Sequence, residues 1–399
     1  YVDRFALLSV VIVAACSDLD DFPDDPPAAF SSRLETLNVP RDEDDPSRGS
    51  VDLDYRVYQD VSVRDGERQA PRGILLFHFG GPGTQNAITL QTFISLVSDA
   101  TFEALIDNYV VVGLDEIGVS AGTRLECGQD YTPGETAELR DDARDYAESC
   151  AGSSWLEEVD TSRLARDVER LRLELGYDSV SFFAISYGAQ VALTYGALYP
   201  EHTGQVVLDS PLDPSPSLVE RYFAQGVGFE AGLERFLAWC DENESCAFGD
   251  GDAVGEFDRW LEELPDEVPN EDDGSGNGGG TANGATDEVL VRTALNLLFR
   301  EESWPSLGAQ LSAIRAGDAE FPSAGDTLDA DAFYATTCAD YQAPSASELD
   351  DFVEDLESAS PRFGPVLRAE PFPCESWTVE RDDRLAWPDS LEGQPAMLI

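Results

Sequence analysis

The sequence predicts an α/β protein in which helices flank a mostly parallel sheet and a helical block interrupts the alternation. Short apolar runs that end in turn residues are typical of strands buried on both faces of a parallel sheet. Such runs alternate here with helical segments, an order that joins parallel strands through right-handed crossovers. The expected strands cover residues 51–58, 73–79, 109–114, 180–183 and 206–208.

Each element has its own signal in the sequence. Residues 51–58 alternate apolar with mostly polar side chains, whereas the run GILLFHF at 73–79 is continuously apolar. Residues 161–176 repeat apolar side chains at helical spacing, with Thr161 as the expected cap at the start and Gly176 at the end. A further helix is expected over residues 188–199, before a proline.

The pattern becomes helical after the last of these strands, over residues 214–263 and 287–315. We interpret this block as a cap over the core, with a flexible acidic, glycine-rich loop at 265–287. The expected segments are a signal at 1–16, an acidic tether at 17–49, the first part of the core at 50–213, the cap at 214–345 and a return to the core at 346–399.

The charge balance of the chain is strongly negative. Asp and Glu number 79 against 25 basic residues, all of them arginine, which gives a net charge of -54. Such a field excludes nonspecific binding of DNA or RNA as a main function. We interpret the acidic surface as adapted to high salt, which screens its self-repulsion. Binding of cationic ligands is the alternative.

Cys16 differs from the other six cysteines because it ends an apolar stretch, in the sequence VAAC at 13–16. This sequence resembles a bacterial lipobox, in which the signal is cut before the cysteine and the thiol is lipidated. We therefore expect an exported lipoprotein of the cell envelope, which touches the membrane only through the lipid on Cys16. A plain secretory signal on a secreted protein is the alternative; either way the segment is a targeting signal.

The remaining six cysteines can form three disulfides, for which the sequence alone allows 15 pairings. Proximity along the chain favours the pairs Cys127 with Cys150, Cys240 with Cys246, and Cys338 with Cys374.

The strongest chemical signal is the sequence AISYG at 184–188, where a buried strand runs through Ser186 into a helix. This is the context of the nucleophile elbow G-x-S-x-G, with Ala184 in place of the first glycine. Small residues two before and two after the serine let the strand and the helix approach each other. The helix start also offers the Tyr187 N–H to a developing oxyanion. An ordinary strand-to-helix turn with a capping serine is the alternative.

A second signal is the sequence FGGPG at 79–83, directly after an earlier apolar strand. Glycines at such a place let backbone N–H groups face a ligand, and we expect the Gly81 N–H to be the second oxyanion donor. Taken alone, the sequence also suits a plain structural turn.

Together these motifs resemble the α/β-hydrolase serine peptidases of the tripeptidyl aminopeptidase and prolyl aminopeptidase type. The resemblance covers about residues 37–399 and continues in four further places, namely residues 39–58, DEIG at 115–118, VVLDSPLDP at 206–214, and the cysteine segments TCAD at 337–340 and PCESW at 373–377. It implies a secreted serine hydrolase that releases short units from peptide N-termini, with Ser186 as the nucleophile.

Acyl transfer by a serine needs a base, normally a histidine that a carboxylate holds. The chain has two histidines, and both are expected to be structural or exposed polar residues. His78 lies in the strand beside the glycine loop, and His202 lies in a helix-to-strand connection at the other end of the sheet.

The resemblance implies the chain order serine, acid, histidine. In the family the acid follows the strand that begins like residues 395–399, so we expect both the acid and the base beyond Ile399, and this chain to be an inactive fragment. Asp209 and Asp213, each after a strand, are alternative acids. Glu220, Glu230 or Glu234 of the cap could hold a substrate's ammonium group, although we expect each of them to lie on a solvated helix face.

No phosphate-binding loop, dinucleotide motif or histidine pair of a metal site occurs, so we expect neither a cofactor nor a metal. The sequence therefore predicts an exported serine hydrolase that cleaves short peptides near the N-terminus through an acyl-enzyme. An esterase of the same fold and a noncatalytic peptide-binding lipoprotein are the alternatives.

Overall fold

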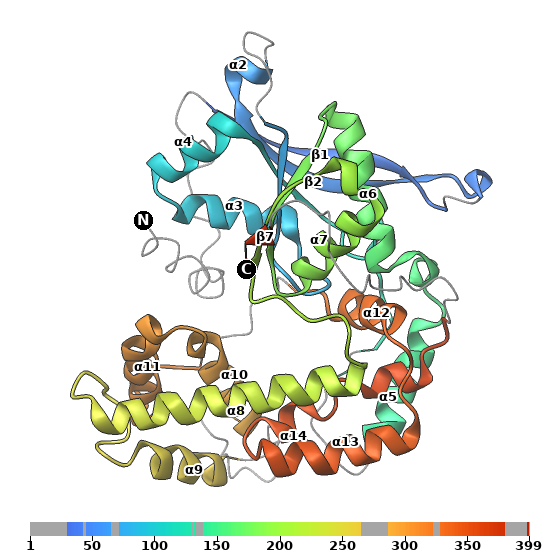
Figure 1. The fold of residues 1–399 in the computed structure, drawn as a ribbon. Coiled ribbons are helices and arrows are strands. Elements are labelled where there is room, and N and C mark those ends of the chain that lie inside the picture. The colour runs from blue at the N-terminus through green and yellow to red at the C-terminus, as the bar shows by residue number, and fades with distance from the viewer. Residues whose placement is uncertain are drawn as a thin grey trace, which may run out of the picture.

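The computed structural model describes residues 30–42, 45–64, 72–129, 131, 139–264, 286–321, 328–379 and 397–398. Its sheet has the strand order β1-β2-β4-β3-β5-β6-β7 (Figure 1). The strands are β1 (Phe30–Pro40), β2 (Ser50–Asp60), β3 (Ile74–His78), β4 (Val110–Leu114), β5 (Val180–Ile185), β6 (Thr203–Asp209) and β7 (Met397–Leu398).

The sheet is mostly parallel, as the sequence predicts. Strands β4, β3, β5, β6 and β7 run parallel to one another. Strand β1 pairs with β2, and β2 with β4, in the antiparallel sense. Every residue of β3 and β4 is buried, because helices cover both faces of these apolar strands.

The tether expected at 17–49 is wrong for part of its length, because residues 30–40 form β1. This strand pairs along its whole length with β2 and not with any other strand of the described sheet. The signal at 1–16 with Cys16, residues 17–29, and residues 265–285 of the expected cap loop lie outside the described residues.

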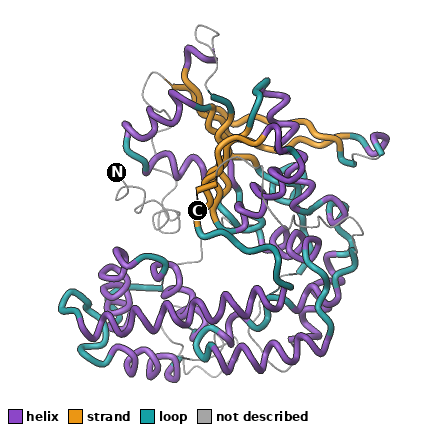
Figure 2. The backbone as a smooth tube through the Cα atoms, viewed as in Figure 1, coloured by secondary structure: helices purple, strands orange, loops and turns teal. Residues whose placement is uncertain are grey.

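Helices cover the two faces of the sheet (Figure 2). Leu75 and Phe77 of β3 face α3 (Asn86–Leu96) and α4 (Asp99–Asn108), whereas Ile74 and Leu76 face the core that includes α6 (Thr161–Leu175) and α7 (Tyr187–Leu198). Helix α6 ends at Gly176 as expected, but its cap at the start is Asp160, whose side chain accepts the Arg163 N–H. Two further helices are α2 (Val61–Arg64) and α5 (Leu139–Cys150).

The cap is a layer of helices below the sheet in Figure 1. Its long helix α8 packs against α9, α10, α13 and α14. The bounds of the cap helices are α8 (Leu218–Glu242), α9 (Ala253–Glu263), α10 (Asp287–Leu298), α11 (Trp304–Ala316), α13 (Ala346–Ala359) and α14 (Gly364–Leu367). Among the described residues, no helix is both long and apolar enough to cross a bilayer.

The sequence prediction misplaces the end of the cap. Residues 346–367 form α13 and α14, which pack on α8, so they extend the cap instead of returning to the core. Within the described part of residues 346–399, the return to the sheet is made by β7, which pairs with β6. After the first cap helices, the chain comes back toward the sheet as α12 (Ala330–Asp340). This helix lies between the sheet and α8 (Figure 1).

Candidate active site

Ser186 stands where β5 ends and α7 begins. Its backbone has φ 52° and ψ -119°, a region that a residue with a Cβ rarely adopts and that costs about 1–3 kcal/mol. The Ser186 N–H donates to the carbonyl of Asp209, the last residue of β6, at 2.9 Å. This strained strand-to-helix turn therefore holds the serine at the carboxyl edge of the sheet.

The small residues around Ser186 have a steric reason. A Cβ at Gly188 would lie 2.6 Å from the carbonyl oxygen of His78 and 3.0 Å from its Cβ, so the first turn of α7 packs directly on the β3 backbone. Ala184 is fully buried and pairs with His78 on one side and Leu208 on the other. An alanine thus fits where the motif has its first glycine.

The glycine loop after β3 lies beside Ser186. A Cβ at Gly80 would lie 3.2 Å from Ser186 Cβ and 3.7 Å from its Oγ. Gly80, Gly81 and Gly83 have φ of 103°, 98° and 90°, a conformation that side chains with a Cβ rarely adopt. The sequence GGPG therefore brings backbone groups, in place of side chains, up to the serine.

Among the described residues, two backbone N–H groups of this region have no hydrogen-bond acceptor. In the described part of the chain, Gly81 N–H meets no acceptor. Tyr187 is the first residue of α7, where an N–H has no acceptor within the helix. The other amides of the loop are occupied: Phe79 N–H donates to Asn86 Oδ1 (2.9 Å), Gly80 N–H to His78 Nδ1 (3.3 Å) and Gly83 N–H to Glu116 Oε1 (2.6 Å).

The loop is held from two directions. Glu116, at the carboxyl end of β4, is buried and accepts the Gly83 N–H. From the other side, the Asp329 N–H at the start of α12 donates to the Gly83 carbonyl at 2.9 Å, and Thr84 forms an isolated bridge with Leu328. The chain returning from the cap thus fixes the loop beside Ser186.

Burial raises the pKa of Glu116 to about 8, although its bond from Gly83 N–H acts in the opposite direction. Burial likewise raises the pKa of the neighbouring Asp115 to about 7. Asp115 accepts the Ala87 N–H at 2.8 Å in the first turn of α3. At neutral pH the Glu116 carboxyl close to the glycine loop is therefore mostly protonated, and that of Asp115 is partly protonated.

We expect the protein to lose stability as the pH rises from about 4.5 to about 8, and E116Q to reduce this loss. Over this range the native state binds a proton at Glu116 that the unfolded chain has released, so the free energy of unfolding falls with rising pH. Melting temperatures at several pH values in molar NaCl check this, because salt screens the surface charges. The exposed Glu157→Gln is the control, and an equal slope in both variants would contradict the assignment.

A buried polar network joins α7 to α6 and α12. Tyr187 Oη lies 2.7 Å from Thr161 Oγ1, and Thr161 donates its N–H and hydroxyl to the two carboxylate oxygens of Asp340 at 3.0 and 2.6 Å. Gln190 also donates to Asp340, at 3.1 Å. The helix that begins at Ser186 is therefore tied to the chain that leaves α12.

Neither histidine bonds to Ser186. Burial lowers the pKa of His78 to about 3, so its imidazole is neutral, and its Nδ1 accepts the Gly80 N–H. His202 precedes β6, at the opposite edge of the sheet, where its Nδ1 lies 3.1 Å from the Asp178 carbonyl. In the described part of the chain, Ser186 Oγ makes no hydrogen bond.

The carboxylates singled out in the sequence are mostly engaged elsewhere. Asp209 accepts the Ser210 hydroxyl at 3.0 Å, and bonds from Ser215 lower the pKa of Asp213. Glu220 bonds to the Ser217 N–H at its own helix start.

Glu230 and Glu234 of α8 differ from each other. Glu230 is buried in an ion pair with Arg362, with 2.6 Å between Oε1 and Nη1, whereas Glu234 is exposed. No group of three or more metal-ligating side chains in the described ranges is placed to hold an ion.

A family model for the alpha/beta hydrolase fold matches residues 73–282, more than half of the chain. The chain belongs to the α/β hydrolase fold family. It is 29% identical over 238 residues to a tripeptidyl aminopeptidase of Streptomyces coelicolor, a match that covers 53% of this chain and 43% of that protein. It is 25% identical over 195 residues to the serine protease Hip1 of Mycobacterium tuberculosis (44% and 36% covered).

A third relative is carboxylesterase B of Mycobacterium tuberculosis, 25% identical over 351 residues, which covers 79% of this chain and 63% of that protein. This α/β hydrolase thus spans less than half of the first two relatives and less than two thirds of the third.

Within the described ranges, three disulfides cross-link this α/β hydrolase, in the pairs that proximity favours. Cys127–Cys150 closes the segment between β4 and the end of α5, and Cys240–Cys246 closes the turn after α8. Cys338–Cys374 joins α12 to the short helix at Phe372–Ser376. The last of these fastens the element that holds the glycine loop to the far end of the cap.

Sequence reasoning missed the roles of Glu116 and Asp340 in this α/β hydrolase. The position of Glu116 could have been inferred from the sequence, because a carboxylate directly after a fully apolar strand lies at the carboxyl edge of the sheet. The sequence also held a signal for Asp340. An acidic residue at a helix C-terminus is disfavoured by the helix dipole unless it has hydrogen-bonding partners.

Proposed function

We propose that this α/β hydrolase is an exported serine hydrolase that cleaves short peptides near the N-terminus. The observation that supports it best is the strained Ser186 beside two unengaged backbone N–H groups, those of Gly81 and Tyr187. Ser186 Oγ attacks the scissile carbonyl, and these two N–H groups stabilise the negative charge of the tetrahedral oxygen. Collapse of this intermediate expels the amine and leaves an acyl-enzyme, which water hydrolyses.

Peptide substrates are proposed because two relatives are a tripeptidyl aminopeptidase and a serine protease. Export is supported by the three disulfides, which persist in oxidising compartments. Anchoring through a lipid on Cys16 remains part of the proposal, on the strength of the VAAC sequence alone.

The proton acceptor for Ser186 is a separate part of the proposal. The chain has two histidines, and in the described structure neither forms a hydrogen bond with Ser186. We propose that the base and its acid belong to a further segment of the protein beyond Ile399. The 399-residue chain alone is therefore expected to acylate slowly, because its serine keeps its proton.

The test uses the protein encoded past Ile399 beside the 399-residue chain. In the longer protein we expect S186A to abolish fluorophosphonate labelling and to lower the turnover of a tripeptide anilide by at least about 10³-fold. Ser210→Ala is the matched control, because Ser210 also has a positive φ at the end of the neighbouring strand. Equal rates for the two chain lengths would refute the missing base, and labelling that survives S186A would refute the nucleophile.

An esterase activity is the second candidate, because the carboxylesterase B match covers the larger share of this chain. Both activities need Ser186, so a mutation at this residue does not separate them. Turnover of a tripeptide anilide compared with a simple aryl ester does so. A longer protein that binds peptides but is not labelled at Ser186 would favour the noncatalytic peptide-binding lipoprotein.

A further inference from the structure

Arg221 occupies the open face of the first turns of α8. Residues seven apart share one face of a helix, and Gly228 and Arg235 follow Arg221 at this spacing. A Cβ at Gly228 would have no neighbour within 4 Å, and both Gly228 and Arg235 are exposed. The nearly opposite face carries Gly226, which packs on Leu356 of α13. The Arg221 face is thus the one that α13 leaves uncovered.

Among the described residues, no carboxylate forms an ion pair with Arg221, although the chain holds 79 acidic residues. In the described part of the chain, no ion pair within 4.0 Å forms at this guanidinium. Asp340 acts on it from a longer distance. However, both carboxylate oxygens of Asp340 already accept bonds from Thr161 or Gln190. The carboxylate that is available nearby is therefore committed to α6 and α7.

Two tyrosines hold the guanidinium in place. Its carbon lies 5.3 Å from the ring centres of both Tyr222 and Tyr341, a distance typical of cation–π contacts. Arg221 Nε and Tyr222 Oη are buried and lack a hydrogen-bond partner among the described residues. Unpaired buried donors are costly, and a carboxylate is the group that a planar guanidinium pairs with best. The cation is therefore positioned in advance but not neutralised.

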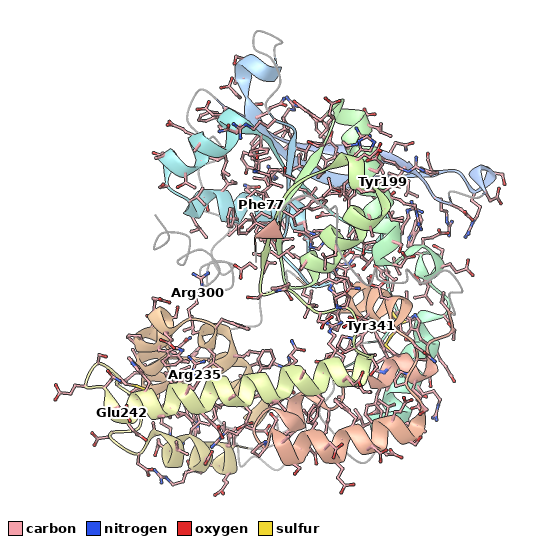
Figure 3. All side chains as sticks on the ribbon, in the orientation of Figure 1. Phe77, Tyr199, Arg235, Glu242, Arg300 and Tyr341 are labelled. Carbon is pink, nitrogen blue, oxygen red and sulfur yellow. A yellow bond between two sulfur atoms is a disulfide. The ribbon has the colours of Figure 1, made fainter. Side chains whose placement is uncertain are left out.

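The position of Arg221 relates it to Ser186. Tyr341 Oη lies 3.5 Å from Gln190 Oε1, and Gln190 lies one turn after Ser186 on α7. Figure 3 shows Tyr341 between α12 and the first half of α8, while Arg235 lies toward α10 and α11. The chain from Asp209, whose carbonyl holds the Ser186 turn, leads directly into α8. Arg221 thus belongs to the junction of the cap with the nucleophile helix.

We propose that Arg221, framed by Tyr222 and Tyr341, is a subsite for a carboxylate of the substrate. This inference rests on the proposed function and specifies its substrate class: peptides that carry an Asp or Glu side chain, or a free C-terminal carboxylate. Arg221 then selects such a peptide and orients it relative to Ser186, without taking part in the chemical steps.

An arginine is needed for this selection because the protein as a whole repels anions. With a net charge of -54, the long-range field favours a neutral peptide over an acidic one. A preference for a carboxylate must therefore come from a local cation that lacks its own counter-ion. Removing this cation is expected to abolish or reverse the preference and not only to weaken it.

The test measures binding by calorimetry to the S186A variant, so that no hydrolysis is needed. The probes are Ala-Ala-Glu-amide, Ala-Ala-Gln-amide, and Ala-Ala-Ala as the amide and as the free acid. We expect at least one carboxylate peptide to bind about tenfold more tightly than its neutral counterpart, and R221Q to abolish or reverse this difference. The Glu–Gln pair and the acid–amide pair tell which carboxylate is recognised.

Arg235→Gln is the matched control, because Arg235 lies on the same face of α8 but is paired with Glu301 and stacked on Trp304. It should keep the preference. R221K keeps the charge but loses the planar fork, and it should keep part of the preference; it also serves if R221Q does not fold. Equal affinity for acidic and neutral peptides, a preference that survives R221Q, or no binding of any probe would overturn the inference.

Failure of the proposed function has a different result. If Ser186 of the longer protein is not labelled while the Arg221-dependent preference persists, the hydrolase proposal fails and the carboxylate site stands. If Ser186 is labelled but the preference is absent, the hydrolase stands and Arg221 only stiffens the cap junction.

Discussion

Replacing Gly188 by alanine is expected to lower the free energy of unfolding by about 3 kcal/mol. The new Cβ would lie 2.6 Å from the His78 carbonyl oxygen, a backbone atom of a buried strand that cannot turn aside. Either α7 moves away from β3, or β3 shifts together with its neighbours β4 and β5. Both outcomes disturb the turn at Ser186. Urea unfolding in molar NaCl measures the loss, and the labelling rate of Ser186 in the longer protein measures the disturbance of the site.

Gly228→Ala is the matched control, because it is also a helical glycine but has no atom within 4 Å of the new Cβ. Alanine favours a helix over glycine by about 0.8–1.0 kcal/mol, so this variant should be slightly more stable than the parent. If the two variants change stability in the same direction and by the same amount, close packing of α7 on β3 is not what requires Gly188.

Replacing Glu230 by alanine is expected to cost about 3 kcal/mol, because it breaks a buried ion pair in the cap. Glu230 accepts Arg362 Nη1 at 2.6 Å and the Arg362 N–H at 2.9 Å, and also the Ser360 hydroxyl at 3.1 Å. Asp258 continues to bind the guanidinium in the variant. The Arg362 N–H loses its acceptor, whereas the Ser360 hydroxyl keeps the Gly226 carbonyl at 3.0 Å. The junction of α13 and α14 with α8 should therefore open first. Urea unfolding, followed by the fluorescence of the cap tryptophans, measures this.

Glu234→Ala tests the same helix one turn further, at an exposed carboxylate. It should change the free energy of unfolding by less than about 0.5 kcal/mol. A loss as large as that of E230A would mean that α8 responds to any lost charge, and would contradict a specific role for the Glu230–Arg362 pair.

The sequence located the core strands well because their signal is local. The apolar run expected at 109–114 is β4 at Val110–Leu114, and the run at 73–79 contains β3 at Ile74–His78. The Ser186 turn was equally readable, since the need for small neighbours follows from the close approach of α7 and β3. In both cases the signal lies in a few consecutive residues, even though the contact that requires Gly188 comes from β3.

The missed features depend on residues far apart in the chain. Strand β1 is formed by pairing with β2 and carries polar side chains and an exposed Leu34, so its own pattern resembles a loop. Helix α13 has the amphipathic pattern of any surface helix, and nothing in residues 346–359 says whether it packs on the core or on α8. The partners of Glu116 and Asp340 likewise come from other elements.

The contact between Gly83 and the start of α12 sets an order of events during synthesis. Gly83 and Thr84 emerge from the ribosome early, but Leu328 and Asp329 follow only after the first cap helices have been made. A nascent chain that ends before residue 328 holds Ser186 yet lacks the brace that shapes the loop beside it. The serine and its neighbouring loop are therefore assembled late in translation, once most of the cap has been made.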